Sequence, residues 1–184
     1  MPILATEISS FPPNLLEDFA AQSYDRRWWA LHTKPRQEKA LARQLLAEET
    51  PFYLPLIPRS RSVRGRRVKS MLPLFGGYLF LFGSDDERLR SLAGSRIVQA
   101  LPVPPGSELL HDLQKVRDLI AAGVPLTPEA RLQPGRRVRV KTGPLMGLEG
   151  VVVSRRGEDR LLIAVHFLEQ GVSVQISDFQ VELL

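Results

Sequence analysis

Residues 28–39 read WWALHTKPRQEK, and the change of pattern within them decides the fold of the first part of the chain. The first five residues are aromatic or apolar, which is typical of a buried β-strand. Thr33 or Lys34 is then expected near the N-cap of a helix, with Pro35 in the first turn, where its missing amide hydrogen costs nothing. An apolar stripe at a spacing of four residues continues this helix until Pro51 ends it. The stretch predicts a strand followed directly by an amphipathic helix.

Strand and helix patterns continue to alternate beyond this point. Expected strands lie at 52–57, 78–82 and 97–101, and expected helices at 87–92 and 108–122. Ser84 or Asp85 is the expected cap of the first of these two helices. Alternating elements around one antiparallel sheet predict an α+β protein whose N-terminal domain, residues 25–122, is an α/β sandwich. Residues 1–24 mix prolines, serines and acidic residues and are expected to form a loosely ordered extension.

A cluster of positive charge lies between residues 59 and 69, with no acidic residue among them. Gly65 stands between two short arms that each carry a valine, which predicts a hairpin with a protruding tip. Clustered arginines neutralise phosphates, and the absence of aromatic residues argues against base stacking. We therefore expect contacts with the backbone of upstream DNA, the alternative being a solvated hairpin without a partner. The basic residues are Arg59, Arg61, Arg64, Arg66, Arg67 and Lys69.

The pattern changes after residue 122. Residues 123–131 contain Pro125 and Pro128 and are expected to form an interdomain linker. Residues 132–184 carry several short valine-rich strand patterns separated by glycines, which predicts a small β-barrel. Gly143 and Gly147 are expected to allow turns with positive φ, and Gly150 to let the returning strand approach closely.

The amino-acid composition and the absence of certain motifs exclude several classes of function. The 184 residues include no cysteine, which excludes disulfides and thiolate zinc sites, and the three histidines have no metal-ligand spacing. No phosphate loop, nucleophile elbow or paired-carboxylate motif appears, so we expect neither an enzyme nor a cofactor. The net charge of +5 favours polyanion partners. The N-terminus does not resemble a secretion signal and the longest apolar run is too short to span a membrane, so a cytoplasmic location is expected.

Two segments resemble one family. Residues 28–39, with PLFGGYLF at 73–80, are similar to the N-terminal domain of the NusG family of transcription elongation factors. Residues 134–152, PGRRVRVKTGPLMGLEGVV, resemble the KOW motif that opens the C-terminal SH3-like barrel of that family. The segments occur in the family's order, and together the two domains would cover residues 27–184. KOW barrels also occur in ribosomal proteins, so a ribosome-binding or RNA-binding module without polymerase contact is the alternative.

The resemblance implies a function and a set of contacts. The N-terminal domain would bind the clamp helices of RNA polymerase through an apolar sheet surface, suppress pausing, and leave the KOW domain to recruit a small-subunit ribosomal protein or a termination factor. Tyr78 and Phe80 share one side of a strand because they are two residues apart; the alternative is that they fill the core. The matching positions are Phe75, Tyr78, Phe80 and Leu101 for the polymerase, and Phe167 and Leu168 for the KOW partner. We expect a monomer.

The helix entry at 33–38 and the residues 53–56 are more similar to the specialised RfaH-like and polysaccharide-operon antiterminators than to the housekeeping member. In those paralogs, basic residues contact the non-template DNA strand. Lys34 and Arg96 match two such positions, and Arg36 beside Lys34 joins this candidate set; a solvated charge at a helix start is the alternative. The KOW domain of RfaH can refold into helices, but the valines at 151–153 favour a stable barrel here.

Overall fold

The computed structural model describes residues 7–17, 24–176 and 181–184. The chain divides into two compact units, Met1–Pro105 and Gly106–Leu184. Within the described residues, no helix has both the length and the apolar character needed to cross a membrane.

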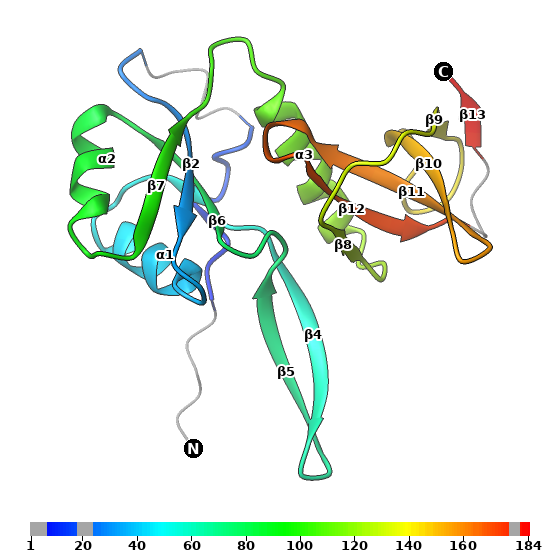
Figure 1. Cartoon of the computed structure of the whole chain (residues 1–184), viewed down its shortest axis with the longest axis horizontal. Coiled ribbons are helices and arrows are strands. Elements are labelled where there is room, and N and C mark those ends of the chain that lie inside the picture. The colour runs from blue at the N-terminus through cyan, green and yellow to red at the C-terminus, as the bar shows by residue number, and fades with distance from the viewer. Residues whose placement is uncertain (1–6, 18–23, 177–180) are drawn as a thin grey trace. The chain divides into compact units, whose positions relative to one another are not determined.

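The first unit is built on a five-stranded antiparallel sheet in the order β1-β3-β6-β2-β7 (Figure 1). The central strand β6 pairs with β2 along its whole length. Strands occupy the regions predicted at 78–82 and 97–101, and the antiparallel sheet is confirmed. The single strand predicted at 52–57 is instead divided between β3 of this sheet and β4 (Leu56–Val63), which belongs to a separate hairpin. The strands are β1 (Ser10–Phe11), β2 (Arg27–Thr33), β3 (Phe52–Tyr53), β6 (Tyr78–Gly83) and β7 (Ile97–Pro102).

Two helices, α1 (Glu38–Ala47) and α2 (Asp85–Leu92), contact each other and β6. The core cluster beneath α1 contains Leu41 and Leu45 of the helix together with alternate residues of the strands, Leu31 of β2 and Leu79 and Leu81 of β6. Because side chains alternate across a strand, the residues between these positions lie on the opposite face of the sheet. The sheet therefore has a helix-covered face and a second face, which is described with the site below.

The predicted start of α1 at Thr33–Pro35 is wrong. Strand β2 runs to Thr33, whose amide donates to the carbonyl oxygen of Gly77 at 2.8 Å, and the amide of Lys34 donates to the carbonyl oxygen of Arg96 at 2.8 Å. Arg36 then has a φ of +63°, and the helix begins only after the N-cap residue Gln37. Pairing with neighbouring segments thus keeps the backbone extended where local pattern alone favours a helix.

The predicted cap of α2 is confirmed. Ser84 accepts a hydrogen bond from the amide of Glu87, and Glu87 accepts one from the amide of Ser84 at 2.8 Å, which makes a capping box. Arg26 also donates to both carboxylate oxygens of Glu87, at 3.0 and 2.6 Å. Burial raises the pKa of Glu87, but the hydrogen bonds from Arg26 and Ser84 outweigh burial and hold this pKa below its ordinary value of 4.5.

This lowered pKa predicts an acid-sensitive first unit. A carboxyl whose pKa is lower in the folded state stabilises the fold above the unfolded value of 4.5, and that contribution is lost as the pH falls through the folded-state value. We expect the wild type to lose about 1–2 kcal/mol more than Glu87→Gln between pH 6 and pH 3, measured by denaturant unfolding at each pH. Asp86→Asn, at an exposed position in the same helix turn, is the control and should keep the wild-type pH dependence. Equal slopes for wild type and Glu87→Gln would contradict the assignment.

A two-stranded hairpin of β4 (Leu56–Val63) and β5 (Arg66–Pro73) projects from the first unit (Figure 1). Val63 pairs with Arg66, so the turn contains only Arg64 and Gly65, with φ values of +50° and +75°. Two positive φ angles in a two-residue loop are the signature of a type I′ turn, which matches the twist of the flanking strands. The predicted hairpin with Gly65 at its tip is confirmed.

The second unit contains a six-stranded antiparallel sheet in the order β13-β9-β10-β11-β12-β8. Helix α3 (Leu109–Ala121) contacts β11 and the short 3-10 helix η2 (His166–Leu168). The expected small β-domain is thus present, with a helix in addition. Its strands are β8 (Thr127–Glu129), β9 (Arg136–Val140), β10 (Glu149–Arg155), β11 (Glu158–Val165), β12 (Gln170–Gln175) and β13 (Val181–Leu183).

The division between the units falls earlier than the sequence indicates. Helix α3, expected at the end of the N-terminal domain, lies in the second unit, and the expected linker at 123–131 contains strand β8, paired with β12. Arg160 fixes this strand, donating to the hydroxyl of Thr127 at 2.8 Å and to the hydroxyl of Ser173 at 2.9 Å. Ser173 in turn donates to Glu129 at 2.6 Å. The segment after α3 is therefore part of the sheet.

The expected loose extension at 1–24 lies partly outside the described residues, which omit 1–6 and 18–23. The described part is packed: β1 pairs with β3, and Leu15 and Leu16 are buried. Residues 7–17 thus belong to the fold of the first unit.

The glycines of the second unit behave as predicted. Gly143 and Gly147 have φ values of +89° and +86°. A Cβ on Gly150 of β10 would lie only 2.7 Å from the carbonyl oxygen of Leu162 in β11. Gly143 and Gly147 adopt a positive φ that residues with a Cβ disfavour. Gly150 is needed because a Cβ there would clash with the neighbouring strand.

Candidate functional site

The second face of the first unit's sheet carries a row of apolar residues across four strands. Phe80 of β6 pairs with Tyr53 of β3 and Ala30 of β2, and Ala30 pairs with Leu101 of β7. Phe80 and Ala30 are fully buried, Tyr53 is nearly so, and Leu101 is half-buried. The small side chain of Ala30 lies between Phe80 and Leu101 in this row.

Aromatic side chains extend this face beyond the row. Tyr78 pairs with His32, and their rings stack with centroids 5.1 Å apart. At the other end of the same strands, the rings of Trp28 and Phe82 lie 5.2 Å apart. Tyr78, His32 and Trp28 are half-buried, so their rings are partly accessible.

The four residues predicted to contact a polymerase differ in accessibility. Phe80, Tyr78 and Leu101 lie on the second face, as the spacing of two predicts for the first pair. Phe75 precedes β6, and its carbonyl oxygen accepts the amide of Tyr78 at 3.2 Å. Phe75 and Phe80 are 2% and 0% exposed, whereas Tyr78 and Leu101 are half-buried. Phe75 and Phe80 complete the core, and Tyr78 and Leu101 are the two that a partner can reach.

The structure brings together two basic residues that are far apart in the sequence. The amide of Lys34 donates to the carbonyl oxygen of Arg96, and the Arg96 guanidinium donates to the amide oxygen of Gln44 in α1 at 2.8 Å. Lys34 and Arg36 are exposed, and Arg96 is half-buried. Lys34 and Arg36 precede α1, and Arg96 reaches the second half of that helix through Gln44.

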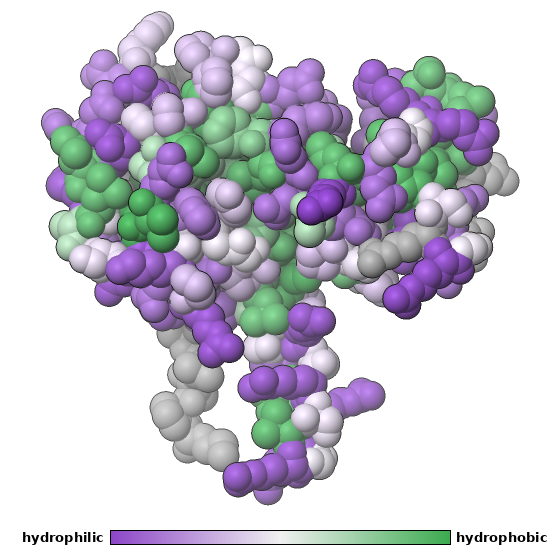
Figure 2. Space-filling model, in the orientation of Figure 1, coloured by the Kyte–Doolittle hydropathy of each residue, from purple (hydrophilic) through white to green (hydrophobic). Residues whose placement is uncertain are grey.

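The six basic residues of the hairpin, which we call the basic ribbon (Arg59, Arg61, Arg64, Arg66, Arg67 and Lys69), are all exposed. Across the described ranges of the chain, none of the six forms a salt bridge with an acidic residue. Figure 2 shows the hairpin as a mostly hydrophilic projection with smaller apolar patches. The positive charges of the basic ribbon are therefore available to a partner.

In the second unit, Phe167 and Leu168 lie in η2 and are half-buried. Asp112 of α3 fixes this turn: one carboxylate oxygen accepts the amide of His166 at 2.9 Å and lies 3.0 Å from its ring nitrogen Nδ1. Asp112 is 1% exposed, so this contact is sheltered from water. The helix thereby positions the turn that carries the two predicted partner-binding residues.

Glu108 joins Asp112 and His166 in a group whose possible ligand atoms lie within 4.8 Å of one another. The sequence gives no sign of it, because 54 residues separate Asp112 from His166. The buried Asp112 is already engaged by two groups of His166, whereas the side chain of Glu108 is 74% exposed and 4.0 Å from the ring. We assign the group a structural role in joining α3 to η2.

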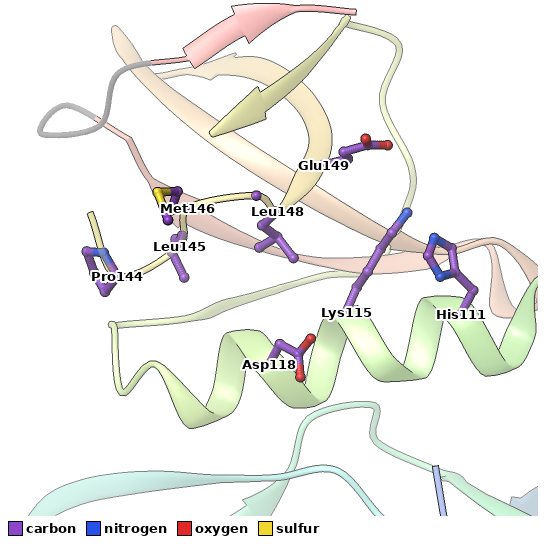
Figure 3. A pocket seen from close by; sticks show the side chains of 9 residues that line it. His111, Lys115, Asp118, Pro144, Leu145, Met146, Leu148 and Glu149 are labelled. Carbon is purple, nitrogen blue, oxygen red and sulfur yellow. The ribbon is translucent and has the colours of Figure 1, made fainter. Parts of the chain in front are cut away.

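A cavity of about 480 Å³ lies beside α3, between His111, Lys115 and Asp118 of the helix and residues 144–149, which form the loop before β10 and its first residue (Figure 3). Lys115 extends from the helix toward Glu149 in this view. A hydrogen bond from Arg139 to Glu149, at 3.0 Å, lowers the pKa of that carboxyl and outweighs its desolvation. The lining residues carry both signs of charge and do not include Phe167 or Leu168.

Comparisons with known proteins point to one family. Residues 26–102 match the family model "Transcription termination factor nusG". A curated relative, "Transcription termination/antitermination protein NusG" of Pseudomonas aeruginosa, is 26% identical over 177 residues, covering 85% of this chain and 98% of the relative. A solved structure described as "Domain interaction in Thermotoga maritima NusG" covers 84% of this chain and 96% of its own, with a TM-score of 0.44 and 15% identity. Residues 26–102, in the first unit of this chain, are therefore similar to the NusG family.

Proposed function

We propose that this chain is a non-catalytic, cytoplasmic transcription elongation or antitermination factor that binds RNA polymerase through the second face of its first unit. The observation that carries the proposal is the combination of the NusG-family match over residues 26–102 with an aromatic sheet face that keeps Tyr78 and Leu101 accessible. The polymerase element expected to receive this face is the clamp helices.

The chemistry of the face supports a protein partner. Protein interfaces concentrate binding energy in a few aromatic or aliphatic anchors near their centre. Tyr78 is held in place by its stack on His32, and Leu101 lies in the same row as the buried Phe80. Anchors that are already ordered lose little conformational entropy when a partner binds.

The remaining contacts complete a bridging mechanism. Lys34, Arg36 and Arg96 would contact the non-template DNA strand, in the manner of the RfaH-like antiterminators, while Phe167 and Leu168 would receive a small-subunit ribosomal protein or a termination factor. Holding the polymerase clamp closed would suppress pausing. The second unit would present its partner at high effective concentration because both units belong to one chain. A monomer suffices for this mechanism.

Replacing the accessible anchors tests the proposal. We expect Tyr78→Ala with Leu101→Ala to weaken binding of core RNA polymerase about tenfold or more, measured by pull-down and titration at moderate salt. Leu89→Ala is the control because Leu89 is 54% exposed and lies in helix α2, outside the sheet. The control should bind like the wild type.

Two outcomes would contradict the proposal. Unchanged polymerase affinity in a folded double variant would remove the docking assignment. Recovery of RNA or ribosomal subunits in place of polymerase would instead favour an RNA-binding module.

A further inference from the structure

The basic ribbon carries its charge on both faces. In an antiparallel pair, residues directly opposite each other point to the same face, and successive residues alternate. The pairs Arg59–Ser70, Arg61–Val68 and Val63–Arg66 therefore share one face, and Ser60–Lys69 and Ser62–Arg67 share the other. Face one thus carries Arg59, Arg61 and Arg66, face two carries Arg67 and Lys69, and Arg64 lies in the turn.

This distribution does not suit a ribbon that lies flat on a phosphate surface. A flat ribbon would use one face and leave the cations of the other in water. Charge on both faces and at the tip instead suits a position between two negatively charged walls. The walls of the B-form DNA major groove are phosphate backbones about 12 Å apart, and this groove admits a two-stranded β-ribbon.

The dimensions of the ribbon agree with this position. A layer of strand with its side chains is about 10 Å thick. Each strand has eight residues, and at about 3.4 Å per step its first and last Cα atoms lie about 24 Å apart. From Arg59 to Lys69 every residue is exposed. The hairpin is therefore long and thin enough to enter the groove without a change in the rest of the unit.

We propose that the β4–β5 hairpin inserts into the major groove of duplex DNA, with face one against the phosphates of one strand and face two against those of the other. The inference deepens the proposed function and rests on it for the presence of DNA beside the bound polymerase. The cations recognise phosphates, so binding is largely independent of sequence.

Other nucleic acids fit less well. Residues 56–73 contain no aromatic side chain, which single-stranded DNA would need for base stacking. The major groove of double-stranded RNA is too deep and narrow for side chains to enter. B-form DNA is the form that both the shape and the composition of the ribbon favour.

The test measures binding of the full chain to one DNA duplex of about 20 base pairs, to its single strand and to the same duplex as RNA, by fluorescence anisotropy between about 50 and 300 mM salt. One variant neutralises face one (Arg59→Gln, Arg61→Gln, Arg66→Gln) and another neutralises face two (Arg67→Gln, Lys69→Gln). The control, Arg90→Gln with Arg131→Gln, removes two exposed charges elsewhere. Circular dichroism verifies that each variant is folded.

We expect each face variant to weaken duplex DNA binding about tenfold or more at about 100 mM salt. The slope of log affinity against log salt should become shallower by about three for face one and about two for face two. The control should change affinity by less than about threefold, and single-stranded DNA and duplex RNA should bind more weakly than duplex DNA.

If only one of the two face variants weakens duplex DNA binding, the ribbon makes a flat contact and the inference is overturned. Equal or tighter binding of single-stranded DNA or duplex RNA would also overturn it. Polymerase binding of the same face variants separates the two proposals. If duplex binding is absent but the wild type still binds polymerase, the groove insertion fails and the proposed function stands. If the wild type does not bind polymerase but both face variants weaken duplex DNA binding, the proposed function fails and the groove insertion stands.

Discussion

Replacing Phe80 by alanine is expected to destabilise the first unit by about 3–5 kcal/mol. Phe80 is 0% exposed on the central strand β6 and lies between Ala30 and Tyr53. The alanine beside it is too small to fill the space that the ring leaves, so the loss of buried area is accompanied by a cavity. Hydrogen exchange should show amides of β2 and β6 exchanging roughly 100-fold faster or more.

Tyr78→Ala is the matched control on the same strand and face. Its ring is half-buried, so its removal should destabilise the unit much less than removal of Phe80. Similar exchange rates in both variants would show that the second face is not packed as described. The comparison also separates a loss of polymerase binding from a loss of folding. If Phe80→Ala fails to bind polymerase, unfolding of the first unit is a sufficient explanation, whereas Tyr78→Ala should remain folded.

Gly150→Ala is expected to destabilise the second unit by about 3 kcal/mol or more. The new Cβ would lie 2.7 Å from the carbonyl oxygen of Leu162 and 2.8 Å from Cδ1 of Ile163. A backbone oxygen cannot move away as the end of a flexible side chain can, so β10 and β11 would have to separate. Amides of these two strands should exchange roughly 100-fold faster, as measured by mass spectrometry of peptide fragments.

Gly157→Ala distinguishes this steric effect from the general effect of losing a glycine. Gly157 has a φ of +81°, but no atom lies within 4 Å of the position that an alanine methyl group would occupy. Alanine there meets only the backbone strain of about 1 kcal/mol. An effect of Gly157→Ala as large as that of Gly150→Ala would contradict the close approach of the strands.

Local patterns predict the parts of this fold that local chemistry controls. The hairpin follows from Gly65 because a two-residue turn needs positive φ, and the cap of α2 follows from Ser84 and Glu87 because their side chains satisfy amides a few residues away. Strands β2, β3, β6 and β7 of the first sheet follow from runs of aromatic and apolar residues, since such runs are buried in almost any packing of the chain.

Contacts between distant segments account for what the sequence does not reveal. The late start of α1 depends on the pairing of Thr33 with Gly77 and of Lys34 with Arg96. The apolar stripe of α3 shows that the helix packs against something, but nothing in its periodicity identifies β11 as the surface. Likewise, the accessibility of Tyr78 and the burial of Phe80 on one face depend on the strands that flank them, not on their own spacing.

The placement of α3 has a consequence for the construction of hybrid proteins from this chain and its relatives. The family match ends at residue 102 and the second unit begins at Gly106, so the natural junction is the segment 103–105. A chimaera joined there would transfer the sheet with its own helix, including the Asp112 carboxylate that holds η2. A junction placed in the proline-containing segment after Gly123 would separate that turn from its support and leave the transplanted sheet incomplete.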